Sequence, residues 1–157
     1  MMMAPCKARF VGTASTRPAR PADADRLYDI HRAAMRELVE QLYGPWDDAE
    51  QRQMQAEWLV AAPVKVIEVE GSVVGAVQVV WESDRAYLSR IEVDPAWQRQ
   101  GVGDAVLDAV LAEADRRRVP VELDVYDINP AVDWYRRRGF ESTTAGPKLH
   151  MIRQPDR

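Results

Sequence analysis

The chain has 157 residues, 46% of them hydrophobic, which suits one compact domain with a buried core. A formal net charge of -4 and a pI near 5.3 exclude a general attraction to nucleic acid or anionic membranes, and no apolar run reaches the roughly 20 residues of a membrane span. The one cysteine, Cys6, excludes an internal disulfide framework, so we expect a protein of the reducing cytoplasm.

The N-terminal part predicts a tail, a strand and a helix. Residues 1–12 have no clear hydrophobic period, and we expect a poorly ordered tail before a single domain at 13–157. A short strand is expected at 13–17. Pro21 at a first helical position, followed by apolar residues with a helical period over 27–42, predicts the first helix.

A second helix is expected before most of the strands. Asp47 or Asp48 can cap its first turn, and Pro63 ends it. Three apolar residues define its expected buried face: Met54, Trp58 and Ala61.

Three strands follow in close succession. The segments 64–70 and 73–81 are rich in β-branched residues, and Gly71-Ser72 between them predicts a hairpin with a tight turn. A third strand is expected at 86–93. The helix after it carries an apolar stripe of five residues: Val106, Leu107, Val110, Leu111 and Ala114.

The C-terminal part alternates strands with a short helix. The strand 121–126 should lie parallel to 86–93, because a helical crossover joins them. Asn129-Pro130 at the start and Gly139 just past the end define the short helix.

Two last strands, at 140–144 and 148–153, would form a hairpin around Gly146-Pro147. The order is strand, two helices, three strands, helix, strand, helix and two strands. It predicts an α/β (α+β) fold with a mixed central sheet of about six to seven strands, flanked by about four helices.

A glycine-containing turn over 98–103, Gln-Arg-Gln-Gly-Val-Gly, joins a strand to a helix. Unpaired N-H groups and the helix dipole favour a bound phosphate at such a turn, although a Gly-x-Gly pair also fits a tight turn without a ligand. A dinucleotide-binding motif would need a third glycine where Val106 stands, and a nucleotide P-loop would need Lys-Ser or Lys-Thr after its second glycine. Neither alternative fits these residues.

What remains resembles motif A of the GNAT acyltransferase superfamily, Gln/Arg-x-x-Gly-x-Gly/Ala, over 98–103. The resemblance runs from about Thr16 to Arg153, and it includes Arg17-Pro18-Ala19 and the segment Tyr-Arg-Arg-Arg-Gly-Phe at 135–140. It implies that two central parallel strands splay apart and that the pantetheine of acetyl-CoA enters between them.

The same resemblance implies a set of cofactor contacts. The backbone at Ile91 and Val93 would pair with pantetheine. Asn129 matches an asparagine that contacts pantetheine, although it stands six residues before Tyr135 where many members have seven, and helix capping explains it equally. The pyrophosphate would be held along the turn by Gln98, Arg99, Gln100, Gly101, Val102, Gly103 and Asp104.

Tyr135 matches the family tyrosine that can protonate the departing thiolate. The alternative is a core residue, because Ala131, Trp134 and Tyr135 fall on one helical face. Asp124 resembles a position used by a glutamate in protein N-terminal alanine acetyltransferases, and an ordinary strand carboxylate is its alternative.

Glu92 is the third catalytic candidate. Tyr87 and Ser89 occupy positions where some relatives carry histidine or glutamate, and strict strand alternation would place Glu92 on the opposite side from them. Neither His31 nor His150 has a partner at metal-ligand spacing, so no metal is expected.

The connection between the first two helices carries Tyr43, Trp46, Asp47 and Asp48. Aromatic rings with carboxylates would suit a cationic amine acceptor, and core packing and helix capping explain them equally.

The resemblance implies an acetyl-CoA-dependent N-acetyltransferase that moves an acetyl group to a primary amine by direct attack in a ternary complex. The acceptor would be a small-molecule amine or a peptide amine. A catalytically silent CoA-binding regulatory module is the alternative, since it would keep the glycine turn without needing Tyr135. The sequence leaves the oligomeric state open, a homodimer included.

Overall fold

The computed structural model describes residues 13–156 of the chain. Residues 1–12, for which we predicted a poorly ordered tail, and residue 157 lie outside the described residues.

The strands form one sheet of seven in the order β1-β2-β3-β4-β5-β7-β6. β4 and β5 are parallel, and the other described neighbours are antiparallel, which confirms the predicted mixed sheet. The strands are β1 (Ala14–Pro18), β2 (Lys65–Val69), β3 (Ser72–Trp81), β4 (Ala86–Val93), β5 (Val121–Tyr126), β6 (Glu141–Ser142) and β7 (Lys148–Arg153).

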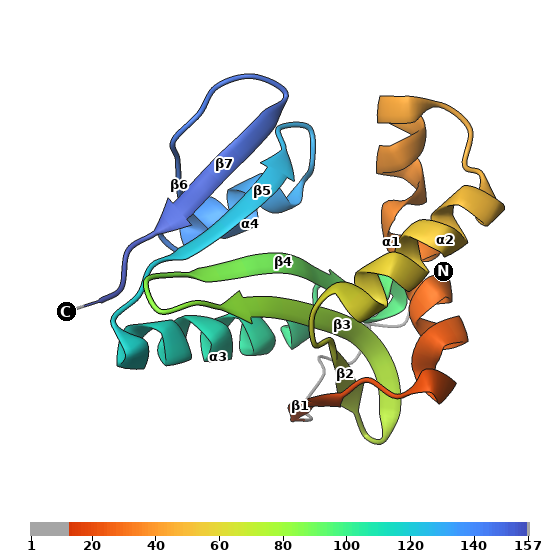
Figure 1. Cartoon of the computed structure of the whole chain (residues 1–157), viewed down its shortest axis with the longest axis horizontal. Coiled ribbons are helices and arrows are strands. Elements are labelled where there is room, and N and C mark those ends of the chain that lie inside the picture. The colour runs from red at the N-terminus through yellow and green to blue at the C-terminus, as the bar shows by residue number, and fades with distance from the viewer. Residues whose placement is uncertain (1–12, 157) are drawn as a thin grey trace, which may run out of the picture.

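Four α-helices flank the sheet, with α1 and α2 on one face and α3 and α4 on the other (Figure 1). In the described part of the chain, no helix is long and apolar enough to cross a membrane. The helices are α1 (Ala24–Tyr43), α2 (Asp48–Ala61), α3 (Val102–Arg117) and α4 (Ala131–Arg137), with 3-10 turns η1 (Pro21–Asp23) and η2 (Pro95–Trp97).

Each face of the sheet has its own core. On the α1 side, Leu27 and Ile30 pack against Val66 and Ala76 of the sheet. On the other side, α3 buries the predicted stripe, with Val110 partly buried, and α4 and Phe140 complete the larger cluster. Burying an apolar side chain of this size contributes roughly 1.5–3 kcal/mol, so these two clusters fix where the helices lie.

Arg17 links the N-terminal elements of the fold through hydrogen bonds. The Arg17 guanidinium on β1 forms two hydrogen bonds to Asp23, at 2.8 and 2.9 Å, and a third to Glu68 of β2 at 2.7 Å. The bond from Arg17 outweighs burial and lowers the pKa of Asp23 to about 2. The arginine thereby joins β1, β2 and the turn before α1.

The buried face of α2 differs from the prediction. Met54 is 53% exposed, whereas Gln51 and Gln55 are buried and Trp58 is partly buried. The apolar period was misleading here because α2 turns a polar face towards β4, where Gln55 contacts the partly buried Arg90.

The hairpin between β2 and β3 turns one residue earlier than predicted. Val69 pairs with Ser72, so the two turn residues are Glu70 and Gly71, with φ of 51° and 80°. Positive φ at both positions matches the right-handed twist of the strands.

Candidate active site

The parallel strands β4 and β5 separate soon after they begin. They pair only at their first two positions, Ala86 with Val121 and Tyr87 with Glu122. Beyond Tyr87, one edge of β4 stays paired with β3 as far as Val93, whereas the other edge borders a widening gap (Figure 1). Backbone groups on that edge have no partner strand and can pair with an extended ligand. The predicted splay is confirmed.

The gap leads to the turn that joins β4 to α3. Arg99 and Gly101 have φ of 61° and 88°, in the left-handed region that only glycine adopts without strain. The helix begins at Val102, and no side chain caps it. Its first-turn amides therefore have no intrahelical acceptor, which is the arrangement that holds a phosphate.

The glutamines of the turn stabilise its shape. Gln98 Nε2 donates to the carbonyl of Val93 at 2.8 Å, and Gln100 Nε2 donates to the carbonyl of Ala96 at 3.1 Å. The side chains of both glutamines are thus used within the turn, which leaves its backbone amides and the Arg99 side chain as the donors for a phosphate.

Gly103 lies where α4 packs on the first turn of α3. A Cβ there would lie 3.4 Å from the Trp134 ring and 3.8 Å from Val93, which are ordinary van der Waals distances, so a small side chain would fit at this position. Asp104 accepts a hydrogen bond from Trp134 Nε1 at 2.7 Å and pairs with Arg138 at 2.6 Å. Arg138 thereby balances a carboxylate that would otherwise repel a phosphate at this helix terminus.

Tyr135 is buried in the larger core cluster, with its ring edge-on to Phe140. Its hydroxyl makes no hydrogen bond with another residue of 13–156. Burial raises the pKa of Tyr135, and the nearby charge of Glu92 raises it further. The hydroxyl is therefore protonated and has no committed partner, as a proton donor requires.

Asn129 caps α4, as predicted. Its Oδ1 accepts a hydrogen bond from the amide of Ala131 at 2.9 Å, and Gly139 follows the helix with φ of 89°. Capping accounts for Asn129 fully, and its contact with pantetheine stays a prediction.

A chain of hydrogen bonds, here called the Asp124 network, joins Tyr87, Asp124, His150 and Glu122. The Tyr87 hydroxyl donates to Asp124 at 2.5 Å, and Asp124 lies 2.9 Å from Nδ1 of His150. The other ring nitrogen of His150 lies 2.9 Å from Glu122. Our sequence reasoning missed His150, whose signal is its register opposite Asp124 in the β5–β7 pair.

The Asp124 network fixes the charge of its members. Hydrogen bonds to Glu122 and Asp124 raise the pKa of His150, so the imidazolium donates to both carboxylates. Burial acts to raise the pKa of Asp124, but the bonds from Tyr87 and His150 outweigh it and lower that pKa. Both ring nitrogens of His150 are used in this way, and within residues 13–156 no cluster of side chains could hold a metal ion.

Glu92 lies on the side of the sheet opposite to the one that strict alternation predicts. The pairing of β4 with β3 shifts by one residue at Ser89, which forms a bulge. A bulge reverses the faces of the residues that follow it. Glu92 therefore shares the α1 side with Tyr87 and lies 2.8 Å from Nδ1 of the buried His31 of α1.

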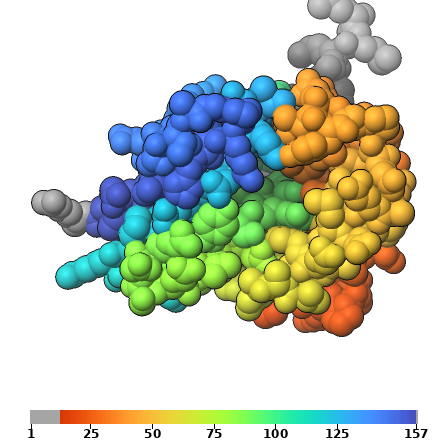
Figure 2. All heavy atoms as spheres, turned by 45° about the horizontal axis from the view of Figure 1, so that its top comes forward, coloured from red at the N-terminus to blue at the C-terminus, as the bar shows by residue number. Residues whose placement is uncertain are grey.

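The end of α1 reaches across to β5. The hydroxyls of Tyr43 and Tyr126 are in contact, although the residues are 83 positions apart in sequence. Figure 2 shows the surface hollowed between the orange α1 and the blue C-terminal strands, with green residues recessed between them. This contact therefore lies at the rim of the splayed region.

The two aspartates of the α1–α2 connection have structural partners. Asp47 accepts the amide of Glu50 at 3.0 Å and caps α2. Asp48 accepts from the Tyr28 hydroxyl at 2.5 Å and from Trp46 Nε1 at 3.1 Å. These bonds support the alternative of capping and packing for this segment.

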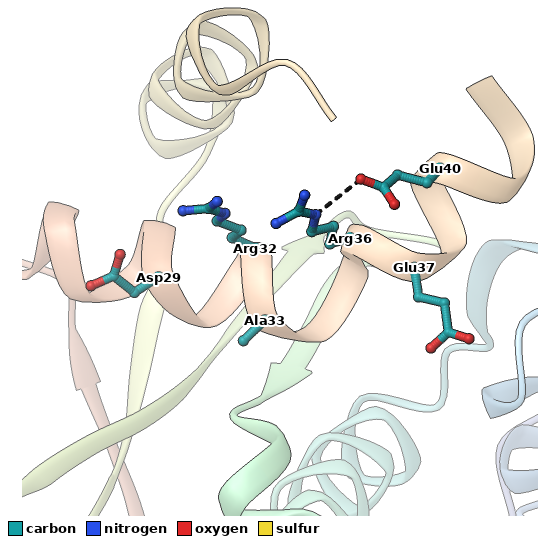
Figure 3. Close-up of a pocket in the computed structure, with 6 residues that line it drawn as sticks. All are labelled: Asp29, Arg32, Ala33, Arg36, Glu37 and Glu40. Carbon is teal, nitrogen blue, oxygen red and sulfur yellow. Dashed lines mark hydrogen bonds and ion pairs between the residues drawn. The ribbon is translucent and has the colours of Figure 1, made fainter. Parts of the chain in front are cut away.

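A separate hollow of about 520 Å³ lies along the exposed side of α1 (Figure 3). All of its lining residues belong to α1, and none comes from β4 or β5. Its arginines face nearby carboxylates, Arg36 with Glu40 at 2.9 Å and Arg32 with Asp48 at 3.8 Å. The splay, and not this hollow, is therefore the candidate active site.

Several solved structures are similar to this chain over most of its length. Ard1 from Thermoplasma volcanium is 25% identical, with 92% of this chain and 99% of that chain covered and a TM-score of 0.65. PaiA N-acetyltransferase from Thermoplasma acidophilum, solved with coenzyme A, is 13% identical, with 90% and 99% covered and a TM-score of 0.70. The ribosomal-protein-S18-alanine N-acetyltransferase from Escherichia coli is 23% identical, with 89% and 91% covered and a TM-score of 0.63.

A search of curated protein sequences gave no match. The acetyltransferase (GNAT) family matches residues 24–140, which includes both splayed strands, the glycine turn and Tyr135. The match spans most of the chain and agrees with the splayed sheet. The chain therefore belongs to the GNAT family of acetyltransferases and is an acyltransferase.

Proposed function

We propose that the chain transfers the acetyl group of acetyl-CoA to a primary amine within a ternary complex. The observation that carries this proposal is the gap between β4 and β5, which leads directly to the uncapped start of α3. An extended thioester arm and its pyrophosphate need those two features in that order.

The cofactor would lie along β4 and the turn. Pantetheine would pair with the free backbone edge at Ile91 and Val93 and pass Asn129. The turn from Gln98 to Asp104 would hold the pyrophosphate through backbone amides, with the buried Val102 side chain anchoring the turn in the core.

The reaction would proceed by direct attack of the amine nitrogen on the thioester carbonyl carbon. Backbone donors of β4 would stabilise the oxyanion, and the carbon–sulfur bond would then break with its electron pair on sulfur. Tyr135 would donate its hydroxyl proton to the thiolate. Its raised pKa keeps that proton available at neutral pH.

The acceptor ammonium must lose one proton before its nitrogen can attack and a second proton after the new carbon–nitrogen bond has formed, and two carboxylates are the candidate bases. Asp124 is held ionised by its network, so it would attract the ammonium and accept the first proton, and the second proton would replace the one that Tyr135 gives to the thiolate. Glu92, with His31 behind it, is the second candidate.

A turnover screen tests the proposal. Acetyl-CoA is mixed with small amines, amino acids, aminoglycosides and peptides with free N-termini, and thiol release and product mass are followed. Transfer to at least one amine is expected. Acetyl-CoA binding without turnover on any acceptor would instead indicate the silent regulatory module.

Two further expectations stay predictions: a cytoplasmic location and a single domain at 13–157. The oligomeric state is open, a homodimer included, and size measurement in solution determines it.

A further inference from the structure

Arg90 of β4 has an unusual environment for a partly buried guanidinium. It donates one hydrogen bond, from Nη1 to the neutral amide oxygen of Gln55 on α2, at 2.6 Å. The nearest carboxylate, Glu92, is 3.8 Å from Nε and already bonds His31. Burial therefore lowers the pKa of Arg90, against the smaller opposing effect of Glu92.

Arg17, an arginine of the same exposure, differs from Arg90 in its hydrogen-bond partners. Both side chains are 21% exposed, yet Arg17 makes three hydrogen bonds to carboxylates, and its pKa is raised by them. Arg90 makes no hydrogen bond to any carboxylate of residues 13–156. Its Nε and Nη2 donors are thus left over, and this fork matches the two oxygens of a carboxylate.

A second unused donor lies beside Arg90. Its guanidinium stacks on the Trp58 ring, 3.9 Å from the centroid. Trp58 Nε1 is buried and has no hydrogen-bond partner among the described residues. Such a buried donor is uncommon and calls for a partner that the structure lacks.

The same helix face adds a third polar group. Gln51, one turn before Gln55, is buried, and its side chain forms no hydrogen bond within residues 13–156. The residues Gln51, Gln55, Trp58 and Arg90, here called the Arg90 cluster, thus gather unused hydrogen-bonding capacity between α2 and β4.

We propose that the Arg90 cluster binds the carboxylate of the acceptor, which makes the acceptor a small amine that also carries a carboxylate, such as an amino acid. This inference rests on the proposed function. Arg90 Nε and Nη2 bind the two carboxylate oxygens, and the Trp58 ring stacks on the guanidinium and holds it in place. The close cover by α2 suits a small molecule better than a folded protein.

The position of the cluster suits this role. Arg90 and Glu92 are alternate residues on the same face of β4, beyond the bulge. Glu92, a candidate base of the proposed reaction, lies 3.8 Å from Arg90 Nε, so the cluster adjoins the proposed reaction centre. A carboxylate held at Arg90 leaves the amine of the same molecule directed towards the splay.

The experiment compares acceptors that differ only in the carboxylate. The kcat/KM of the wild-type chain is measured for a panel of L-amino acids and for the matching amino acid amides. A charged hydrogen-bonded contact predicts a preference for the acids of at least roughly tenfold. Arg90→Gln should bring this ratio to about one, and Arg90→Lys, which keeps the charge but not the fork, should fall between.

Arg116→Gln is the matched control, since this arginine is exposed and, among the described residues, pairs with Glu113 alone on α3. It should leave the ratio unchanged. Thermal unfolding of Arg90→Gln reports on folding separately.

The outcomes separate this inference from the proposed function. Transfer to amines with equal rates for acids and amides, or an unchanged ratio in Arg90→Gln, keeps the transferase and overturns the carboxylate site. If no amine turns over, acids and amides are compared by calorimetry with coenzyme A present. Tighter binding of the acids that is lost in Arg90→Gln supports the site even then, and equal or absent binding overturns it.

Discussion

The two halves of the proposed active site are built differently. The cofactor half, at 98–104, consists of consecutive residues whose proposed ligands are backbone amides. The acceptor half combines side chains from α2 and β4 in the Arg90 cluster, and from β4, β5 and β7 in the Asp124 network. A site made of consecutive backbone groups leaves a local pattern in the sequence, whereas one made of distant side chains leaves none.

The largest effect is expected in the cofactor half, for Gly101→Asp. Nothing lies within 4 Å of a Cβ at Gly101, so the new carboxylate would point into the space proposed for the pyrophosphate. We expect acetyl-CoA affinity to fall by more than about 100-fold, because two anions would meet at close range. Calorimetry measures the loss.

Gly146→Asp is the matched control for this change. Gly146 also has positive φ, at 104°, and open space around its Cβ position, but it lies in the loop before β7. Both variants should lose about 1 kcal/mol of unfolding free energy from backbone strain. Equal loss of cofactor affinity in both would contradict the assignment of the turn.

Tyr135→Phe tests the proposed proton donor, which would act between the cofactor half and the acceptor half. Loss of the hydroxyl proton donor should lower kcat by roughly 100-fold. The dissociation constant for acetyl-CoA should change little, since the ring and its packing against Phe140 remain. An unchanged kcat would assign Tyr135 to the core alone.

Gly75→Ala tests the position of β4, the strand that borders both halves of the proposed site. A Cβ at Gly75 of β3 would lie 2.3 Å from the carbonyl oxygen of Glu92, so β4 must shift. We expect a loss of about 2 kcal/mol in unfolding free energy, and lower activity than the remaining folded fraction accounts for. Gly71→Ala, with positive φ and open space, is the control and should affect stability without affecting kcat.

Much of the fold could be predicted because its signals are local. The strands at 86–93 and 121–126, the stripe of α3 and the cap at Asn129 each follow from short spacing rules, and the structure confirms them. The face of α2 could not be predicted in this way. Hydrophobic period assumes an apolar interior, and α2 packs Gln51 and Gln55 inward.

In the candidate site too, features with a local sequence pattern could be predicted and features that depend on distant contacts could not. The turn was recognisable from Gly101 and Gly103, although only the structure shows that Gly103 packs against Trp134. The side of Glu92 could not be read from alternation, since the bulge at Ser89 depends on the pairing of β4 with β3. No short sequence pattern marks Arg90. Its proposed role depends on which of its hydrogen-bond donors the side chains of α2 leave unpaired.

The smallest effect is expected in the acceptor half, for His150→Gln, and it should depend on pH. The pKa of His150 is raised by Glu122 and Asp124, so its stabilisation is full below the ordinary histidine value of 6.5 and is lost as pH rises through the raised value. The lowered pKa of Glu122, due first to His150, gives stability that is present above its ordinary value of 4.5 and is lost as pH falls through the lowered value.

The wild-type chain should therefore exceed His150→Gln in unfolding free energy most clearly between about pH 4.5 and 6.5, by less than about 1 kcal/mol because the network is partly exposed. Denaturant titrations at pH 5.5 and 9 measure the difference, which should shrink at the higher pH. Acetyl-CoA affinity should stay unchanged while the KM of the acceptor rises, since the network belongs to the acceptor half. If His150→Gln instead weakened acetyl-CoA binding, the Asp124 network on β5 would contribute to the cofactor half as well as to the acceptor half.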